Sequence, residues 1–428
     1  MLDVNFIRNN SGKVREGTEK KGMNPNIVDE FLSLDEKWRR AVSELDETRA
    51  KQNEVTKKLS AGKNEEFLKE AKSLKERVSL LEKEEKELRE KREEALLQIP
   101  NVPFEDVPVG GDEKGNQELR AVGKKRDFTR EGFEPKDHLE LGEALGILDF
   151  LRGAKVSGSG FYYLKDEAVL LEIGLVRYAL DMLEKRGFGL VFTPDMAREK
   201  FYLGTGYLPR GPEAQTYQIQ GTNLGLIATS EVTLAGLHAD EILREEELPK
   251  LYAGYSHCFR QEDGAYGKYS KGLYRVHQFT KVEMFAYTLP EESAGMHQKF
   301  LALEEEIWKG LGIPYRVLLM CTGDLGGQAA KKYDLEAWMP GRGDWGEITS
   351  TSNTTDFQAR RLGIKYRGKD GILRFAHTVN GTAIATARAI VAILENYQKK
   401  DGSVEIPKVL RKYVGKKIIS SSNSRGGT

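Results

Sequence analysis

The sequence contains very little cysteine. Cys258 and Cys321 are the only two in 428 residues, and they form neither a Cys-x-x-Cys pair nor a zinc-ligand spacing. A disulfide framework is therefore excluded, and we expect two reduced thiols of the kind found in cytosolic proteins.

Long apolar runs are also absent. No window approaches the roughly 18 consecutive apolar residues of a membrane-spanning helix, and the first 17 residues lack the apolar core of a signal peptide. These absences predict a cytoplasmic protein with no membrane partner. The net charge neither favours nor disfavours a nucleic-acid partner, because Lys+Arg and Asp+Glu both number 66. Any basic surface must be local.

Common nucleotide and hydrolase motifs are missing too. The chain has no Gly-x-x-x-x-Gly-Lys-Ser/Thr phosphate loop, no His-Glu-x-x-His and no Gly-x-Ser-x-Gly. The segment GRGDWG at 341–346 matches Gly-x-Gly-x-x-Gly, but it follows a proline and precedes EITSTSN, which does not resemble a helix. A dinucleotide site of the Rossmann type is therefore rejected.

Residues 26–99 are the most regular part of the chain. They contain no proline and one glycine, Gly62, and apolar or neutral residues recur at alternating steps of three and four over 31–59 and 67–81. This spacing is typical of a coiled-coil seam. Two helices joined at 60–64 predict an antiparallel hairpin at least about 45 Å long.

The hairpin has two possible functions. It is either a solvated strut or dimerisation device, or a lever that reaches a large partner. Basic residues of the first helix, Arg39, Arg40, Lys51 and Lys58 among them, would serve the second function. The charge pattern leaves both open.

The remainder of the chain predicts a mixed fold. Residues 100–116 hold three prolines and three glycines and are interpreted as a linker. Strand-like runs such as 248–262 and 274–288 then alternate with helical runs at 169–187 and 291–311. Strands separated mostly by hairpin-sized loops favour an α+β fold with an antiparallel sheet.

The segment FRQEDGAYGKYSKGLYRVHQFTKVE at 259–283 concentrates charge around a loop rich in Gly, Lys and Tyr. Alternation along two strands places Arg260 with Glu262 on one face, and Arg275 with every second residue up to Glu283 on the other strand. This set is either a cross-strand ion-pair ladder or a phosphate clamp, because an arginine fork binds phosphate bidentately. Both remain open on these residues alone.

The order of motifs along the chain is more specific. The segment 259–283 resembles motif 2 of the class II aminoacyl-tRNA synthetases. Pro194, within a strand after a long helix, resembles motif 1. GTAIATAR at 381–388 resembles motif 3, although alanine stands at 383, 385 and 387 in place of glycine or other small residues. Alanine is still small enough for close backbone approach.

Further segments narrow this resemblance. The predicted hairpin, ATSEVTL at 228–234, GDWGEITSTSNTTDFQARR at 343–361 and HTVNGTAIATAR at 377–388 together are similar to the seryl-tRNA synthetase family. The resemblance covers essentially the whole chain except the last few residues. It implies a tRNA-binding domain with a coiled-coil arm at 1–105 and a class II catalytic domain with a mainly antiparallel sheet flanked by helices at 106–418. The low-complexity composition of the last residues predicts a disordered tail at 419–428.

The resemblance also implies the reaction and its partners. Serine and ATP would form seryl-adenylate and pyrophosphate, and the seryl group would pass to the 3′-terminal adenosine of tRNA-Ser and of tRNA-Sec. A homodimer and Mg²⁺ bound with ATP are expected. Alternatives from other classes are an adenylating homologue that charges a non-tRNA acceptor, which would have no use for the hairpin, and a non-catalytic tRNA-binding or structural coiled-coil protein, which would have lost the site residues.

Roles for individual residues follow from the resemblance. Arg260 is expected at the α-phosphate, Glu262 and Val276 at the adenine, and Arg388 at the γ-phosphate. The other expected ATP-binding residues are Gln261, Glu347, Ile348, Thr349 and Ser350. Glu347 and Ser350 are also the expected Mg²⁺ ligands, because this hard ion prefers oxygen.

Serine and tRNA complete the expected contacts. The serine site is expected at Thr229, Ser230, Glu231, Glu283 and Thr382. Which glutamate receives the ammonium group and which the hydroxyl is left open. In this family the hairpin clasps the long variable arm of the tRNA, so Arg39, Arg40, Lys51 and Lys58 are candidate phosphate contacts, with Lys268 and Lys271 at the acceptor end.

Overall fold

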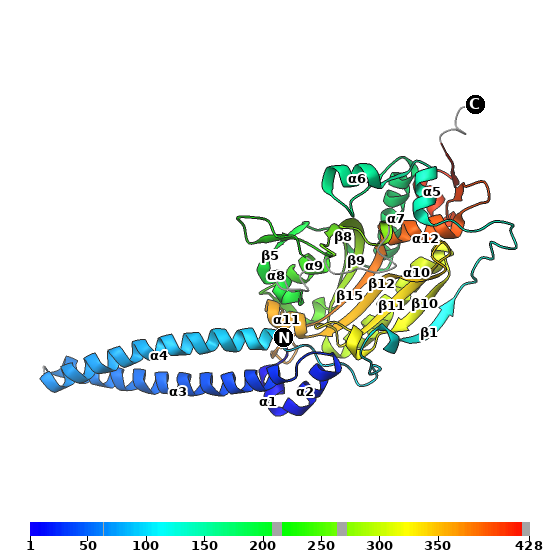
Figure 1. The fold of residues 1–428 in the computed structure, drawn as a ribbon. Coiled ribbons are helices and arrows are strands. Elements are labelled where there is room, and N and C mark those ends of the chain that lie inside the picture. Colours follow the sequence, from blue (N-terminus) through cyan, green and yellow to red (C-terminus); the bar gives the residue numbers. More distant parts are fainter. Residues whose placement is uncertain (63, 208–215, 263–271, 422–428) are drawn as a thin grey trace. The chain divides into compact units, whose positions relative to one another are not determined.

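The computed structural model describes residues 1–62, 64–207, 216–262 and 272–421. Its internal contacts divide the chain into two compact units, Met1–Val102 and Pro103–Thr428. Each unit is described by itself (Figure 1). Among the described residues, no helix is both long enough and apolar enough to cross a membrane.

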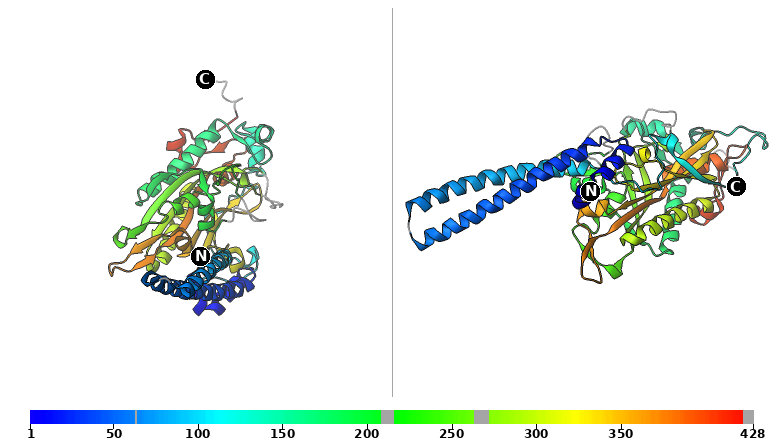
Figure 2. Two further views of the ribbon diagram at one scale, coloured as in Figure 1. Left: turned by 90° about the vertical axis from the view of Figure 1, so that its left-hand side faces the viewer. Right: turned by 90° about the horizontal axis from the view of Figure 1, so that it is seen from below.

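The first unit contains the predicted helical hairpin. Helices α3 and α4 lie side by side (Figures 1 and 2), and the turn between them falls at Gly62. The side chain of Asn64 caps the second helix by accepting a hydrogen bond from the Glu66 amide at 2.8 Å. The helices of this unit are α1 (Val4–Asn9), α2 (Ser11–Lys20), α3 (Asn26–Ala61) and α4 (Glu65–Gln98).

The predicted seam is the inner side of the hairpin. The positions that repeat every three or four residues in 31–59 and 67–81 are buried or half-buried. Leu45, Val78 and Leu81 pack together at the centre of this seam. The coiled-coil prediction is therefore confirmed.

The apolar pattern weakens after residue 81 because two polar side chains occupy seam positions. Glu85 accepts a hydrogen bond from Trp38 Nε1 at 2.9 Å. The guanidinium carbon of Arg92 lies 4.6 Å from the centre of the Trp38 ring. Trp38 on α3 thus contacts both polar residues of α4, and the helices stay paired where the apolar pattern of the sequence weakens.

Asp35 is the buried charge that fixes the base of the hairpin. Only 1% of the residue is exposed. It accepts hydrogen bonds from Arg92 Nε at 2.8 Å, from Arg8 Nε at 2.8 Å and from Arg39 Nε at 3.1 Å. Burial disfavours its charged form, but the bonds from Arg8 and Arg92 hold its pKa below the ordinary value. A buried polar group of this kind specifies register as well as stability.

The second unit is built on one large sheet, which confirms the α+β prediction. In the part of the chain that the structure describes, this sheet has eight strands, and every neighbouring pair is antiparallel except β4 with β8. In spatial order the strands are β1 (Gln117–Val122), β10 (Tyr315–Leu319), β11 (Lys331–Met339), β12 (Asp344–Thr355), β15 (His377–Ala385), β9 (Gln278–Thr288), β8 (Lys250–Phe259) and β4 (Gly189–Phe192).

Helices pack against this sheet and short strands extend it. Helix α10 packs on β12 and β15, α7 packs on β8, β9 and β15, and α12 follows β15 directly. The helices are α5 (His138–Ala144), α6 (Phe150–Ser157), α7 (Glu167–Glu184), α8 (Glu199–Thr205), α9 (Glu231–Gly236), α10 (Ser293–Leu311), α11 (Phe357–Leu362), α12 (Thr386–Tyr397) and α13 (Arg411–Val414). The short strands are β2 (Leu148–Asp149), β3 (Tyr163–Leu164), β5 (Met196–Arg198), β6 (Leu224–Leu226), β7 (Ile242–Arg244), β13 (Lys365–Arg367), β14 (Leu373–Phe375), β16 (Val404–Glu405) and β17 (Ile418–Ile419).

The two faces of the central strands differ. Gly381 on β15 faces α10, because a Cβ there would lie 2.9 Å from Glu304 Oε1. Thr349 on β12 also faces this helix and donates to Glu304 Oε2 at 2.9 Å. Successive residues of a strand alternate between faces. Their neighbours Thr382 and Ser350 therefore point to the opposite, more open face.

One part of the strand prediction is wrong. Strand β8 ends at Phe259 and β9 begins at Gln278, so Arg260, Glu262 and Arg275 lie beyond the strand ends and do not alternate with them. The backbone leaves the extended conformation here, since Glu262 has a φ of +53°. The predicted alternation holds only within β9, from Phe279 onward.

We expect the Asp35 cluster to dominate the stability of the hairpin base. Asp35→Ala would remove the shared acceptor of Arg8, Arg39 and Arg92, whose side chains are 29%, 52% and 12% exposed. We expect it to lower the free energy of unfolding of the first unit by about 2–3 kcal/mol, as for lost hydrogen bonds between charged groups. Hydrogen exchange of α3 and α4 in the full chain measures this locally. Glu36→Ala is the matched control, because Glu36 pairs with Arg40 on the exposed side and should change stability by less than about 1 kcal/mol. Equal effects of the two variants would contradict the role of Asp35.

Candidate active site

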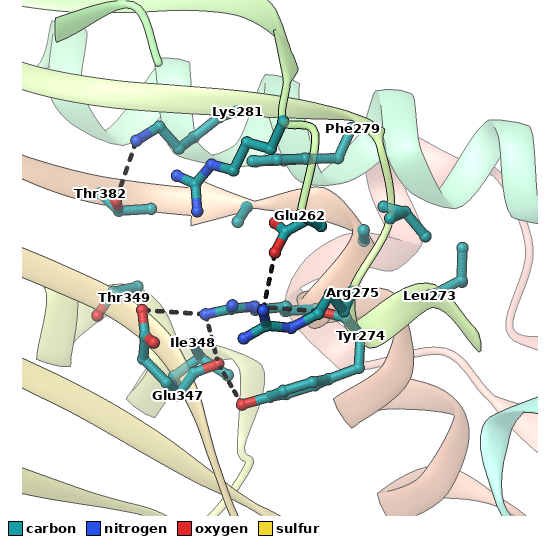
Figure 3. A pocket seen from close by; sticks show the side chains of 15 residues that line it. Glu262, Leu273, Tyr274, Arg275, Phe279, Lys281, Glu347, Ile348, Thr349 and Thr382 are labelled. Atoms are coloured by element: carbon teal, nitrogen blue, oxygen red, sulfur yellow. Dashed lines mark hydrogen bonds and ion pairs between the residues drawn. The ribbon is translucent and has the colours of Figure 1, made fainter. Parts of the chain in front are cut away.

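A pocket opens over β9, β12, β15 and the first turn of α12 (Figure 3). The structure brings most of the predicted ATP-binding residues to its lining, which includes Arg260, Glu262, Val276, Glu347, Ile348, Thr349 and Arg388. Thr382, predicted for serine, also lines it. Segments more than a hundred residues apart in the sequence thus form one site.

Glu262 is held by an arginine for which no separate ligand role is expected. Arg275 Nη1 lies 2.9 Å from Glu262 Oε2, and Figure 3 shows the pair projecting into the pocket. Both side chains are partly exposed, at 36% for Arg275 and 18% for Glu262. The pair fixes two side chains that come from opposite ends of the motif 2 segment.

Arg388 and Glu347 form a second pair across the pocket. Arg388 Nη1 lies 3.0 Å from Glu347 Oε1 and also donates to the Glu347 carbonyl at 3.1 Å. Burial disfavours the charged form of Glu347, but neighbouring cations, chiefly Arg388 and then Lys332, lower its pKa to about 2. Its side chain is 44% exposed, so an ionised carboxylate is presented to the pocket.

Glu347 and Ser350 share a face because β12 contains a bulge. Ser350 lies opposite Asp334 and Glu347 lies opposite Glu336, which leaves Ile348 as the extra residue. In a regular strand, residues three apart would point to opposite faces. The bulge therefore places on one face of β12 the carboxylate and the hydroxyl that the sequence proposes as metal ligands.

The remaining predicted ATP residues differ in exposure. The guanidinium carbon of Arg260 lies 5.2 Å from the centre of the Phe279 ring, and Arg260 Nε lies 3.4 Å from the Ala228 carbonyl. Gln261 is half-buried and Val276 is buried at 4% exposure. Ile348 is buried in the core at 1% exposure, so it offers the pocket chiefly its backbone.

A buried ion pair lies at the centre of the predicted serine site. Lys281 Nζ is 2.5 Å from Glu283 Oε2, and the Thr382 hydroxyl donates to the same carboxylate oxygen at 3.2 Å. The side chains of Lys281 and Glu283 are only 7% and 2% exposed. Lys281 therefore balances the negative charge of Glu283 before any ligand binds.

Glu231 is buried among neutral donors instead. Gln358 and Asn380 donate to its Oε1 at 2.7 and 3.0 Å, and the Tyr207 hydroxyl donates to Oε2 at 3.0 Å. Burial and then the charge of Glu283 raise the pKa of Glu231 to about 7. This carboxyl group is poised between its neutral and charged forms near neutral pH.

Thr229 and Ser230 support this part of the site through local bonds. The Thr229 hydroxyl accepts a hydrogen bond from the Glu231 amide at 3.2 Å. The Ser230 hydroxyl donates to the Gly254 carbonyl at 3.3 Å. Both residues are fully buried. They hold the start of α9 in place against β8.

The comparisons with known proteins match both units. Residues 1–103 match the family described as "Seryl-tRNA synthetase N-terminal domain", and residues 216–397 match "tRNA synthetase class II core domain (G, H, P, S and T)". A serine–tRNA ligase of Rubrobacter xylanophilus is 53% identical over 423 residues, which cover 98% of this chain and 99% of that protein. The chain belongs to the seryl-tRNA synthetase family.

Solved structures agree with this family. The seryl-tRNA synthetase of Pyrococcus horikoshii, solved with ATP, has a TM-score of 0.92 at 45% identity and covers 98% of this chain and 100% of its own. The cytoplasmic serine–tRNA ligase of Naegleria fowleri, solved with AMP, has a TM-score of 0.86 at 35% identity over 99% of both chains. The chain is therefore an enzyme of the aminoacyl-tRNA synthetase class, as the motif order predicted.

Several residues around the candidate site were not predicted from the sequence. Lys281, Asn380, Gln358, Tyr207 and Tyr274 contact predicted residues, as described above or, for Tyr274, through a hydrogen bond to Glu347. Lys281 and Asn380 could have been found by alternation, since each lies two residues before a predicted serine-binding residue on its strand. Tyr207 and Gln358 carry no such signal, because they reach the site from other elements.

The predicted tRNA contacts of the helical hairpin lie exposed on α3. Arg40 and Lys58 pair with glutamates one helical turn earlier, and Arg39 pairs with Asp35. Lys51 is exposed as well. Lys268 and Lys271 lie outside the described residues.

The raised pKa of Glu231 predicts a pH-dependent stability. The unfolded carboxyl titrates near 4.5 and the folded one near 7, so the stabilisation by the neutral form is complete below pH 4.5 and is lost as the pH rises to about 7. The loss amounts to roughly 3 kcal/mol. The melting temperature of Glu231→Gln minus that of the native protein should therefore be larger at pH 8 than at pH 5.

Calorimetry at both pH values measures this gain. Glu184→Gln, at an exposed position of α7, is the matched control. If the melting temperatures of Glu231→Gln and the native protein differed by the same amount at both pH values, a folded-state pKa near 7 would be contradicted.

Proposed function

We propose that the protein activates serine with ATP and transfers the seryl group to tRNA-Ser. The observation that carries the proposal is the pocket lined by Arg260, Arg388 and Glu347 together with Lys281. Because Lys281 is paired with the buried Glu283, a nucleotide site and an amino-acid site adjoin here. The family membership of the chain supports the same reaction. Extension to tRNA-Sec rests on the family resemblance alone.

The first step needs alignment more than proton transfer. A carboxylate oxygen of serine attacks the α-phosphorus, a new P–O bond forms, and the bond to the leaving pyrophosphate breaks. The serine carboxylate is already ionised, so no general base is required. Arg260 would neutralise charge at the α-phosphate and Arg388 at the γ-phosphate, where fixed cations act strongly. In the second step a ribose hydroxyl of the tRNA displaces AMP from the adenylate.

Glu347 and Ser350 fit a magnesium ion that arrives with the nucleotide. The carboxylate is ionised and half exposed, and the bulge places the serine hydroxyl on its face. Within the described residues no group of three or more His, Cys, Asp or Glu side chains gathers as a metal site. Mg²⁺ commonly uses one or two protein oxygens and takes the rest from phosphates and water. Bound there, it would add positive charge beside the phosphates.

The two glutamates of the serine site suit different groups. Glu283 is already paired with Lys281, whereas Glu231 has neutral donors around it. An ammonium ion therefore gains more from Glu231, and we assign it there. Glu283 beside Thr382 is assigned to the substrate hydroxyl. A site that hydrogen-bonds this hydroxyl rejects alanine, because its buried polar groups would be left unpaired.

The proposal includes a homodimer and two domain roles. Strand β4 is at the edge of the sheet and exposes Leu190 at 43% and Phe192 at 69%, while α7 exposes Ile173 at 59%. Apolar side chains on an edge strand and its neighbouring helix suit a second copy of the chain. Residues 1–105 are proposed to bind tRNA and 106–418 to perform the chemistry.

Arg260→Ala tests the activation step. We expect serine-dependent exchange of pyrophosphate into ATP to fall by at least about a hundredfold, with tRNA binding retained. Arg186→Ala is the matched control, because Arg186 pairs with Glu306 on the exposed surface. Exchange near the native rate in Arg260→Ala would show that the phosphate role is wrong. Exchange by the native protein without charging of tRNA would favour an acceptor other than tRNA.

Charge reversal on the arm tests the tRNA contacts. Arg40, Lys51 and Lys58 changed together to Glu should leave exchange unchanged and raise the KM for tRNA at least about tenfold, because each lost phosphate contact weakens binding. The matched control reverses Lys72, Lys75 and Lys83, which are exposed on α4. Charging assays at two salt concentrations measure both. An equal loss in the two triple variants would contradict a contact surface specific to α3.

A further inference from the structure

Tyr274 occupies a central place that the proposed mechanism leaves unused. It ends the short 3-10 helix Gly272–Tyr274, between the Gly/Lys/Tyr loop and β9. Its hydroxyl donates to the Glu347 carbonyl at 3.2 Å, and Figure 3 shows the side chain reaching across the pocket floor toward Glu347. Its own carbonyl accepts a hydrogen bond from Arg388 Nε at 3.4 Å. One residue thus joins motif 2, strand β12 and helix α12.

The contacts of Arg388 fall into two kinds. Its bond to the Glu347 carboxylate is exchangeable, because that carboxylate is proposed to turn toward a metal ion. Its other contacts do not use the carboxylate: the Tyr274 carbonyl, the Glu347 carbonyl at 3.1 Å, and the Tyr274 ring, whose centre lies 4.8 Å from the guanidinium carbon. These contacts can hold the Arg388 guanidinium group in position when the Glu347 carboxylate turns away.

A second arginine supports the same ring. The guanidinium carbon of Arg342, in the turn between β11 and β12, lies 5.0 Å from the centre of the Tyr274 ring. Gly346 makes this approach possible, because a Cβ there would lie 3.0 Å from Tyr274 Cε2 and 3.1 Å from Arg342 Nη1. An aromatic face attracts guanidinium groups. The ring is thus fixed by Arg342 while it contacts Arg388.

We propose that Tyr274, supported by Arg342, is the positioning residue that holds the Arg388 guanidinium ready for the nucleotide phosphates. The inference rests on the proposed function and adds residues that act through Arg388 rather than on the substrate. Loss of the ring would let Arg388 move away from the position where phosphate charge develops.

Pyrophosphate exchange with the full-length protein tests the proposal through Tyr274→Leu. We expect kcat/KM for ATP to fall roughly 10- to 100-fold, as for a misplaced catalytic group, with the KM for serine unchanged. Tyr274→Phe keeps the ring and should lose less than about tenfold. Tyr397→Leu is the matched control, because Tyr397 lies on the same helix as Arg388 and its hydroxyl donates to the Leu311 carbonyl at 2.6 Å, away from the pocket lining. Active-site titration normalises each rate to folded enzyme.

A double-mutant cycle shows whether Tyr274 acts through Arg388. The double variant Tyr274→Leu/Arg388→Ala should exchange pyrophosphate no more slowly than Arg388→Ala alone. Adding Arg342→Met should slow exchange in the native background but should cause no further loss in the Tyr274→Leu background. Additive losses, an equal rise in the KM for serine, or a neutral Tyr274→Leu would each overturn the proposal. A neutral Arg342→Met would overturn the part assigned to Arg342. Failure of exchange in the native protein would instead overturn the proposed function.

Discussion

Arg388, through its contacts with Glu347, is the residue on which the geometry of the pocket depends. It joins the first turn of α12 to β12, and the two residues are 41 positions apart in the chain. Arg388 holds the Glu347 carbonyl as well as its carboxylate, so the backbone of the bulged strand is fixed with the side chain. Because the two charges neutralise each other, a highly charged site can remain folded without a ligand. The same logic applies to Glu262 with Arg275 and to Glu283 with Lys281.

The sequence predicted the elements better than it predicted their ends. Seam spacing was enough for the hairpin, and run lengths with turn residues were enough for the antiparallel sheet. The seam pattern weakened after residue 81, although Leu88 and Ala95 stay in phase, because Glu85 and Arg92 do not look like core residues. Their contacts with Trp38 explain their position. Strand ends failed at Arg260 and Glu262, where a positive φ breaks the alternation.

The site residues show the same division. Motif order pointed to Arg260, Glu347 and Arg388, and the structure gathers them in one pocket. The bulge that places Glu347 and Ser350 on one face was not visible in the sequence, because nothing in the residue types of β12 marks Ile348 as the bulged residue. Partners such as Gln358 depend on tertiary packing alone. A motif therefore identifies which residues carry the chemistry, while the fold decides which of them are charged and which are already satisfied.

The Asp35 cluster has a consequence for how the arm reaches. The hairpin base is fixed by polar contacts, whereas the seam beyond it repeats every seven residues. Adding or removing seven residues in both helices would keep the seam in phase and leave the base untouched. Each such step would change the length by about 10 Å at 1.5 Å per residue. The length of the hairpin can therefore change in evolution by whole heptads, while the contacts at its base and the residues of the pocket stay the same.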